Sequence, residues 1–305
     1  MDQAKGLRQM AETDAMKKRK ANTGSGRESR RGSSQMTYPR VIAVTSGKGG
    51  VGKTNIVGNL AVAMTRMGKR VVIIDADVGL ANVDILFNLR PEYNIRHLVS
   101  GEKSLDQVMA RTGHGIGILP GGSGFADLTR LSQGEKLTLL AEFETLADQA
   151  DIILLDTGAG ISSNVLYFNS AADECLVVAT TEPTSITDAY ALMKVMSQKY
   201  DTRYFKLVVN MAENQADAKR VYHSLSNALD KFLKNVVLEY AGFIPYDREL
   251  QTAVRNRRIL LDASSDTPAG KAMTSIADRL LRSKMRHHAQ GNLTFFMNRV
   301  FEAVE

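Results

Sequence analysis

The residues between positions 47 and 54 have the types and spacing that bind phosphate groups. They are Gly47, Lys48, Gly49, Gly50, Val51, Gly52, Lys53 and Thr54, and they match the pattern G-x-x-x-x-G-K-[ST]. The glycines let the backbone curl so that successive N–H groups face phosphate oxygens. Lys53 can then reach the β- and γ-phosphates, and the Thr54 hydroxyl can bind Mg²⁺. The spacing predicts a site for a nucleoside triphosphate with Mg²⁺, and we include the next residue, Asn55, in it.

Three further carboxylates follow apolar runs of the chain. Asp156 closes the run DIILLD, and Asp75 and Asp77 lie in IIDADVGLANVD. Ligands of a doubly wound sheet bind at the carboxyl ends of its strands, so we expect these acids beside the phosphate-binding loop. We assign Asp75 and Asp156, with Thr54, to Mg²⁺, and we treat all three acids as candidate catalytic residues. Each acid could instead cap a turn, and for Asp84 we prefer that interpretation.

The elements that must position these residues are visible as apolar runs that alternate with helical patterns. Several runs are apolar on successive residues, as in VVIID and CLVVAT, which is typical of strands covered on both faces. The expected strands are Val41–Thr45, Arg70–Asp75, Ile116–Pro120, Ile152–Asp156, Cys175–Thr180, Leu207–Asn210 and Val236–Phe243. The expected helices lie near residues 54–67, 133–149, 185–200 and 214–233, and Pro268 opens another. This alternation predicts an α/β fold with a doubly wound, mostly parallel sheet flanked by helices.

The formal net charge of +6 is unevenly distributed over the 305 residues. Residues 1–40 hold ten Lys and Arg against four Asp and Glu, whereas residues 41–305 hold 29 of each. The leader, residues 1–39, is rich in Ser, Gly, Lys and Arg and has little to bury, so we expect it to be flexible. A basic tail can contact phosphate or anionic lipid, although most such runs are simply solvated.

Two features of the composition exclude whole classes of protein. Cys175 is the single cysteine, and one thiol cannot form an intrachain disulfide, a zinc knuckle or a cluster ligand set. The sequence also lacks an apolar run long enough for a membrane-spanning helix or a signal peptide. We therefore expect a cytoplasmic globular protein.

The segment KGGVGKT, with its second lysine at Lys48, resembles the deviant Walker A motif of the MinD/ParA/Mrp ATPase family. Asp75-x-Asp77 and the run Asp156-Thr157-Gly158 resemble the switch I and switch II segments of that family. The resemblance implies ATP and Mg²⁺ as cofactors and an ATP hydrolase that dimerises with itself. It makes Lys48 a catalytic residue that reaches the partner's nucleotide, and Asp77 the acid that orients the attacking water. Positive charge donated in trans would couple hydrolysis to dimerisation.

Two later segments resemble the adenine-side loops of this family. Asn210 ends the strand KLVVN, and Pro245, Tyr246 and Asp247 lie in GFIPYD. We place all four residues in the cofactor site on this resemblance. An ordinary asparagine at the end of a strand is the competing interpretation of Asn210, and both remain open at this point.

The first residues resemble one group within the family. Asp2, Gln3, Ala4, Lys5, Gly6, Leu7 and Arg8 are similar to the DQAxxLR motif of the FlhG group (FleN, YlxH), which stimulates the SRP-like GTPase FlhF. Residues 3–16 have helical periodicity but only a thin apolar stripe, so we expect them to fold on binding a partner. An accidental match in a flexible tail is the alternative.

The last residues predict an amphipathic helix. At 100° per residue, Ala303, Phe296, Val300, Leu293, Val304, Met297 and Phe301 fall on one side of residues 293–305. The segment follows a basic stretch and resembles the membrane-targeting helices of MinD and FlhG. The alternative is that the helix packs permanently on the domain. We accordingly divide the chain into the leader 1–39, an ATPase domain 40–288 and a membrane-targeting helix within 289–305, with membrane contact through 291–305.

The resemblance favours an ATP-dependent dimerising switch that regulates flagellar number or placement. Its expected partners are a second copy of the chain, an FlhF-like GTPase through Asp2–Arg8, flagellar switch or C-ring proteins or a flagellar transcriptional activator, and the inner face of the plasma membrane. The alternatives are a MinD-type regulator of the division site and a ParA-like DNA-partition ATPase. The neutral body argues against DNA binding, which needs several Lys and Arg on phosphates.

Overall fold

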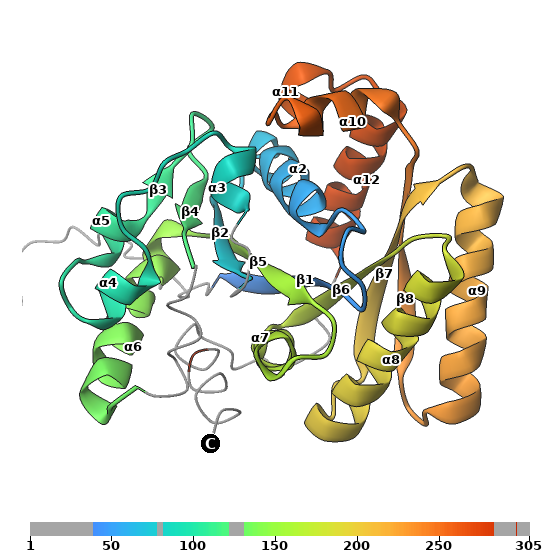
Figure 1. The fold of residues 1–305 in the computed structure, drawn as a ribbon, viewed down its shortest axis with the longest axis horizontal. Coiled ribbons are helices and arrows are strands. Elements are labelled where there is room, and N and C mark those ends of the chain that lie inside the picture. The colour runs from blue at the N-terminus through green and yellow to red at the C-terminus, as the bar shows by residue number, and fades with distance from the viewer. Residues whose placement is uncertain (1–38, 78–81, 122–130, 284–296, 298–305) are drawn as a thin grey trace, which may run out of the picture. The chain divides into compact units, whose positions relative to one another are not determined.

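The computed structural model describes residues 39–77, 82–121, 131–283 and 297, all within the unit Tyr38–Glu305. Its centre is an eight-stranded sheet of order β3-β4-β2-β5-β1-β6-β7-β8 (Figure 1). Neighbouring strands are parallel except β3 and β4 at one edge. The strands are β1 (Arg40–Ser46), β2 (Val71–Ala76), β3 (Ala110–Arg111), β4 (Gly117–Leu119), β5 (Ile152–Ala159), β6 (Glu174–Ala179), β7 (Tyr204–Ala212) and β8 (Val237–Pro245).

Helices cover both faces of this sheet (Figure 1). They are α2 (Lys53–Arg66), α3 (Val83–Leu86), α4 (Ile95–Val99), α5 (Leu105–Val108), α6 (Gln133–Gln149), α7 (Ser163–Ala171), α8 (Pro183–Tyr200), α9 (Gln215–Phe232), α10 (Arg248–Arg255), α11 (Leu260–Ala263) and α12 (Pro268–Arg282). The apolar residues of α2, α11 and α12 form one core with the sheet. Those of α4–α6 and those of α8 and α9 form two cores on the other face, with α7 contributing to both.

The expected doubly wound, mostly parallel α/β fold is confirmed. Each of the seven expected strands is present, with ends that differ by a few residues. In β1, Ile42 and Val44 face the α2 and α12 core, whereas Val41 and Ala43 face the opposite core. Because both faces are covered, such strands show no alternation of apolar and polar residues.

The short elements were not expected from the sequence. β3 has two residues, and α3, α4, α5 and α11 have four or five each, which is too short to establish a period. α7, with nine residues, and α10, with eight, were also missed. The expected helix after Pro268 is confirmed: Thr267 caps it by accepting a hydrogen bond from the N–H of Gly270.

A buried ionic cluster fixes the end of α12 to the sheet. Glu174 forms ion pairs with Arg40 and with Lys206, whose Nζ lies 2.6 Å from Glu174 Oε2. Arg40 also donates to the carbonyl oxygen of Leu280 and to the Ser283 hydroxyl. The three charged side chains are only about a tenth exposed, at 9 to 11%. The first residues of β1 and the last turn of α12 are therefore held at one point.

Candidate nucleotide-binding site

The phosphate-binding loop connects the end of β1 to the start of α2. Gly50 and Gly52 have φ angles of 77° and 92°, a conformation that residues with a Cβ adopt at a cost. At Gly47 a Cβ would lie 2.1 Å from the carbonyl carbon of Asp188 in α8. The loop can therefore approach α8 closely only with glycine at position 47. This curled backbone ends at the N-terminus of α2, the arrangement that receives phosphate.

Lys53 is positioned at the base of this loop. Its Nζ donates to the Ser46 hydroxyl at 3.0 Å, and Ser46 donates in turn to the carbonyl oxygen of Lys48. Burial lowers the pKa of Lys53, and the charges of Asp156 and Asp77 oppose that shift. A cation held in a buried place with nearby acids suits a ligand that brings its own negative charge and Mg²⁺.

Thr54 and Asp156 meet at the position expected for Mg²⁺. Asp156 is 2% exposed and accepts a hydrogen bond from Thr54. Its Oδ1 is buried and has no hydrogen-bond partner in the described part of the chain. Burial raises the pKa of Asp156 to about 7, and the nearby Asp75 adds to the rise. An orphaned buried carboxylate oxygen beside a threonine hydroxyl is a donor set that Mg²⁺ or its bound water would satisfy. These residues therefore fit the ion.

Asp75 sits beside Asp156, because the two residues are register partners in β2 and β5. Its carboxylate oxygens accept hydrogen bonds from the backbone N–H groups of Asp77, Asn82 and Val83, at 3.0 to 3.2 Å. Burial raises the pKa of Asp75 to about 6. These contacts give Asp75 a structural part in holding the switch I segment against the sheet. Metal binding by Asp75 stays a prediction.

Asp77 lies in the same cavity as the phosphate-binding loop. This cavity of about 470 Å³ is lined by Asp77 together with Lys53, Thr54 and Asn55. A Cβ on Gly158 of the switch II segment would lie 3.5 Å from Asp77 Oδ1. The structure thus brings Asp77 between the phosphate-binding loop and switch II, and its role with the attacking water stays a prediction.

Lys48 does not line this cavity and contacts the start of α8 instead. Its Nζ lies 2.6 Å from Glu182 Oε2 and donates to the Thr184 hydroxyl at 3.0 Å. The Lys48 side chain is 40% exposed. The second lysine of the loop is therefore held at the surface by its own subunit.

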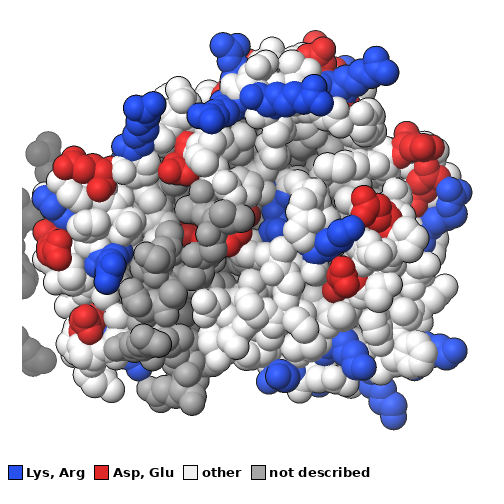
Figure 2. Space-filling model, viewed as in Figure 1, with Lys and Arg blue, Asp and Glu red and all other residues white. Residues whose placement is uncertain are grey.

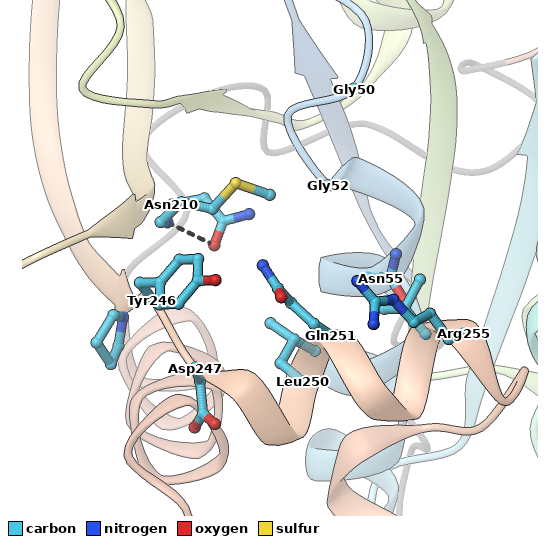
Figure 3. Close-up of a pocket in the computed structure, with 12 residues that line it drawn as sticks. Gly50, Gly52, Asn55, Asn210, Tyr246, Asp247, Leu250, Gln251 and Arg255 are labelled. Carbon is cyan, nitrogen blue, oxygen red and sulfur yellow. Dashed lines mark hydrogen bonds between the residues drawn. The ribbon is translucent and has the colours of Figure 1, made fainter.

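A second cavity, of about 320 Å³, extends from the loop toward β7 and β8 (Figure 3). The four residues that we assigned to the adenine side, Asn210, Pro245, Tyr246 and Asp247, all line it, as does Asn55. Each oxygen of the Asp247 carboxylate already accepts a hydrogen bond, one from the N–H of Glu249 and the other from the N–H of Ala269. Asp247 therefore caps α10 and ties it to α12.

The sequence analysis missed the wall that α10 adds to this cavity. Met211 at the end of β7 lines the cavity as well, and so do the α10 residues Leu250, Gln251, Val254 and Arg255. The signal that could have found them is the cap at Asp247 followed by an amphipathic turn, RELQTAVR. Arg257, which follows α10 with a φ of 53°, lines the phosphate cavity. Arg255, Arg257 and Arg258 at the end of α10 and just after it are exposed. Figure 2 shows a row of Lys and Arg side chains along the top of the molecule in this view.

Comparison with known proteins agrees with this geometry. The family model ParA, described as "NUBPL iron-transfer P-loop NTPase", matches residues 37–281. The chain belongs to the ParA family of P-loop NTPases. The expected MinD/ParA-type ATPase, similar to the FlhG group, is confirmed, and the chain is a nucleotide-binding ATP hydrolase.

Two curated relatives are similar over most of their length. Antiactivator FleN of Pseudomonas aeruginosa is 38% identical over 263 residues, which cover 86% of this chain and 94% of FleN. Flagellum site-determining protein YlxH of Helicobacter pylori is 35% identical over 246 residues, which cover 81% of this chain and 83% of YlxH. Among solved structures, a chain of the MinC:MinD cell division protein complex of Aquifex aeolicus has a TM-score of 0.65 and 27% identity, with 83% of this chain and all of that chain covered.

The expected partner segment and the expected membrane-targeting helix lie near the two ends of this ParA-family chain. The partner segment Asp2–Arg8 lies outside the described residues, and so does the expected terminal helix apart from Met297. Met297 is described, and it is fully buried in the core that includes α4–α6. None of the described helices combines the length and the apolar character needed to cross a membrane.

Proposed function

We propose that this ATPase is an ATP-dependent dimerisation switch that regulates flagellar number or placement. The similarity to proteins named as a flagellar antiactivator and as a flagellum site-determining protein supports the cellular role. The observation that carries the switch is the position of Lys48. Its ammonium group lies against Glu182 at the start of α8, while Lys53 occupies the phosphate side of the cavity.

In the proposed mechanism, the chain's own residues hold the triphosphate and prepare its hydrolysis. The loop N–H groups and Lys53 bind the phosphates, and Thr54 and Asp156 would hold Mg²⁺, which neutralises charge on the phosphate oxygens. Asp77 orients the attacking water. Lys48 leaves Glu182 and reaches the nucleotide of the second copy, where its charge stabilises the transition state. Hydrolysis is therefore fast only in the dimer.

The output of the switch involves the two ends of the chain. We infer that Asp2–Arg8 binds and stimulates an FlhF-like GTPase, and that the terminal helix binds the inner face of the plasma membrane. The complete burial of Met297 supports a helix that its own domain covers in the free monomer. Two copies of the helix on one dimer would bind a membrane far more tightly than one copy does. Flagellar switch or C-ring proteins and a flagellar transcriptional activator are the other proposed partners.

Three variants test the switch. With ATP and Mg²⁺, the wild-type chain should dimerise and hydrolyse ATP. Asp77→Ala should remain a dimer but no longer hydrolyse ATP. Light scattering after size exclusion measures the dimer, and an ATPase assay measures hydrolysis. Lys48→Ala should bind ATP as a monomer, and Lys53→Ala should lose ATP binding in calorimetry. If Lys48→Ala loses ATP binding as completely as Lys53→Ala, Lys48 serves its own subunit and the proposed switch is wrong.

Separate measurements test the output. Deletion of residues 1–20 should spare ATPase activity and abolish stimulation of FlhF. Replacement of Phe296, Val300 and Phe301 by Ser should abolish ATP-enhanced sedimentation with anionic liposomes and leave nucleotide binding intact. Sedimentation that is independent of ATP and of these substitutions would remove the membrane role.

A further inference from the structure

The amide of Asn210 is already used by the protein. Its Nδ2 donates to the carbonyl oxygen of Val51 at 2.8 Å. Its Oδ1 accepts from the N–H of Met211 at 2.9 Å, the hydrogen bond drawn in Figure 3. Asn210 is 2% exposed, and its Nδ2 would lie 2.6 Å from a Cβ at Gly52. These contacts tie β7 to the phosphate-binding loop. They fix the orientation of the Asn210 amide and leave it one N–H and one oxygen lone pair for a ligand.

Gln251 offers a second amide on the opposite wall of the same cavity. Its side chain rises from α10 toward Asn210 and Tyr246 (Figure 3). Within the part of the chain that the structure describes, no hydrogen bond of the Gln251 side chain is present, and the residue is exposed. A glutamine amide has both donors and an acceptor, so it can pair with a group that presents one of each.

The shape of the cavity limits what can lie beside Gln251. At one end are Gly50, Gly52 and Asn55 of the phosphate-binding loop and α2, so the phosphates of a bound nucleotide lie there. On the side of β8 and the start of α10 the cavity has apolar walls from Pro245, Tyr246 and Leu250. Apolar walls with a few placed polar groups are the usual surroundings of a flat ligand such as a nucleobase. The base therefore lies at the end where Gln251 projects.

We propose that Gln251 reads the base and selects adenine over guanine by pairing with adenine N6 and N7. The amide oxygen accepts from the N6 amine while the amide nitrogen donates to N7, the pairing that Gln makes with adenine elsewhere. Guanine presents acceptors at both O6 and N7, so Gln251 can satisfy only one of them well. This inference rests on the proposed nucleotide site and adds a specificity-determining residue that lies outside the sequence motifs.

Binding of nucleoside diphosphates tests this proposal, because the protein's ATPase activity does not consume them. Calorimetry on the full chain would compare ADP, GDP and 7-deaza-ADP, which lacks the N7 acceptor, in the presence of Mg²⁺. The wild-type chain should prefer ADP over each of the other two about tenfold, which corresponds to about 1.4 kcal/mol. Gln251→Leu should reduce both preferences to less than about twofold. Gln251→Glu keeps an acceptor for N6 but loses the donor to N7, so it should lose the preference over 7-deaza-ADP and keep the preference over GDP.

Thr252→Leu is the matched control, because Thr252 is the next residue of α10, is exposed and does not line the cavity. It should bind the three nucleotides as the wild-type chain does. If Gln251→Leu keeps both preferences, or if Thr252→Leu loses them equally, Gln251 does not read the base. If the wild-type chain binds none of the diphosphates, the proposed nucleotide site is wrong. If the wild-type chain binds them and Gln251→Leu keeps the same selectivity, only the proposal on Gln251 is wrong.

Discussion

Lys48 Nζ and Glu182 Oε2 lie 2.6 Å apart, which joins the phosphate-binding loop to the first residues of α8. Both side chains are largely exposed, at 40% and 63%. Exposed ion pairs of this kind contribute about 0.2 to 1 kcal/mol. Glu182 therefore holds Lys48 weakly, and the proposed dimer would need to supply no more than this energy to release it.

Removal of this contact should favour the dimer. Glu182→Gln frees Lys48 to reach the second copy, so the ATP-bound chain should dimerise at a protein concentration roughly two- to fivefold lower. Light scattering across a dilution series measures the midpoint. Asp230→Asn, on the exposed side of α9, removes the same charge and should leave the midpoint unchanged. A weaker dimer in Glu182→Gln would mean that Glu182 itself belongs to the interface.

Neutralisation of Asp156 should stabilise the free protein while it damages the proposed Mg²⁺ site. Burial raises the pKa of Asp156 to about 7, so the folded chain binds this proton more tightly than the unfolded chain does. Its contribution to stability is therefore lost as pH rises from about 4 to 7. Asp156→Asn should raise the free energy of unfolding by on the order of 2 kcal/mol at pH 8, and by less at pH 5.

Urea unfolding followed by circular dichroism suits the test of Asp156→Asn, since the chain has no Trp. The same variant should lose Mg²⁺-dependent tightening of ATP binding, measured by calorimetry with and without a chelator. A variant that is less stable than the wild-type chain at pH 8 would show that the Asp156 charge is well solvated or well paired in the folded state.

The ionic cluster at the end of α12 gives a prediction on stability. Glu174→Ala leaves Arg40 and Lys206 buried without their carboxylate, which should cost about 3 to 5 kcal/mol. Chemical unfolding measures this loss. Glu213→Ala removes an exposed carboxylate and should change stability by less than about 0.5 kcal/mol. A loss below about 1 kcal/mol in Glu174→Ala would mean that water replaces the pair.

A substitution in the turn after α10 should stabilise the protein. Arg257 has a left-handed φ of 53°, which is costly for a residue with a Cβ. Arg257→Gly should therefore raise the free energy of unfolding by about 0.5 to 1 kcal/mol, because glycine adopts this conformation without strain. Arg258→Gly, at the next position with no positive φ, should lower it. Equal effects of the two substitutions would mean that the strain at Arg257 is offset by contacts of its side chain.

The site could be predicted from the sequence where its chemistry lies in consecutive residues. Residues 47–54 could be identified as the phosphate-binding loop because the glycine turn, the lysine and the hydroxyl that act on the phosphates follow one another in the sequence. The strands that lead to Asp75 and Asp156 were visible as apolar runs, since strands buried on both faces leave that pattern. These features need no knowledge of distant contacts.

Contacts between distant segments could be decided only by the tertiary structure. The partner of Lys48 lies 134 residues away in the sequence, and the amide of Asn210 contacts Val51 across 159 residues. The wall formed by α10 faces the phosphate-binding loop because the Asp247 carboxylate holds both α10 and α12, a contact that spans 22 residues to Ala269. Periodicity describes how one segment presents its faces, and it carries no information on which segment lies opposite. Sheet order and helix packing decide that, and they thereby decide which hydrogen bonds Asp75 accepts, which residue Lys48 contacts and which amides line the cavity beside the phosphate-binding loop.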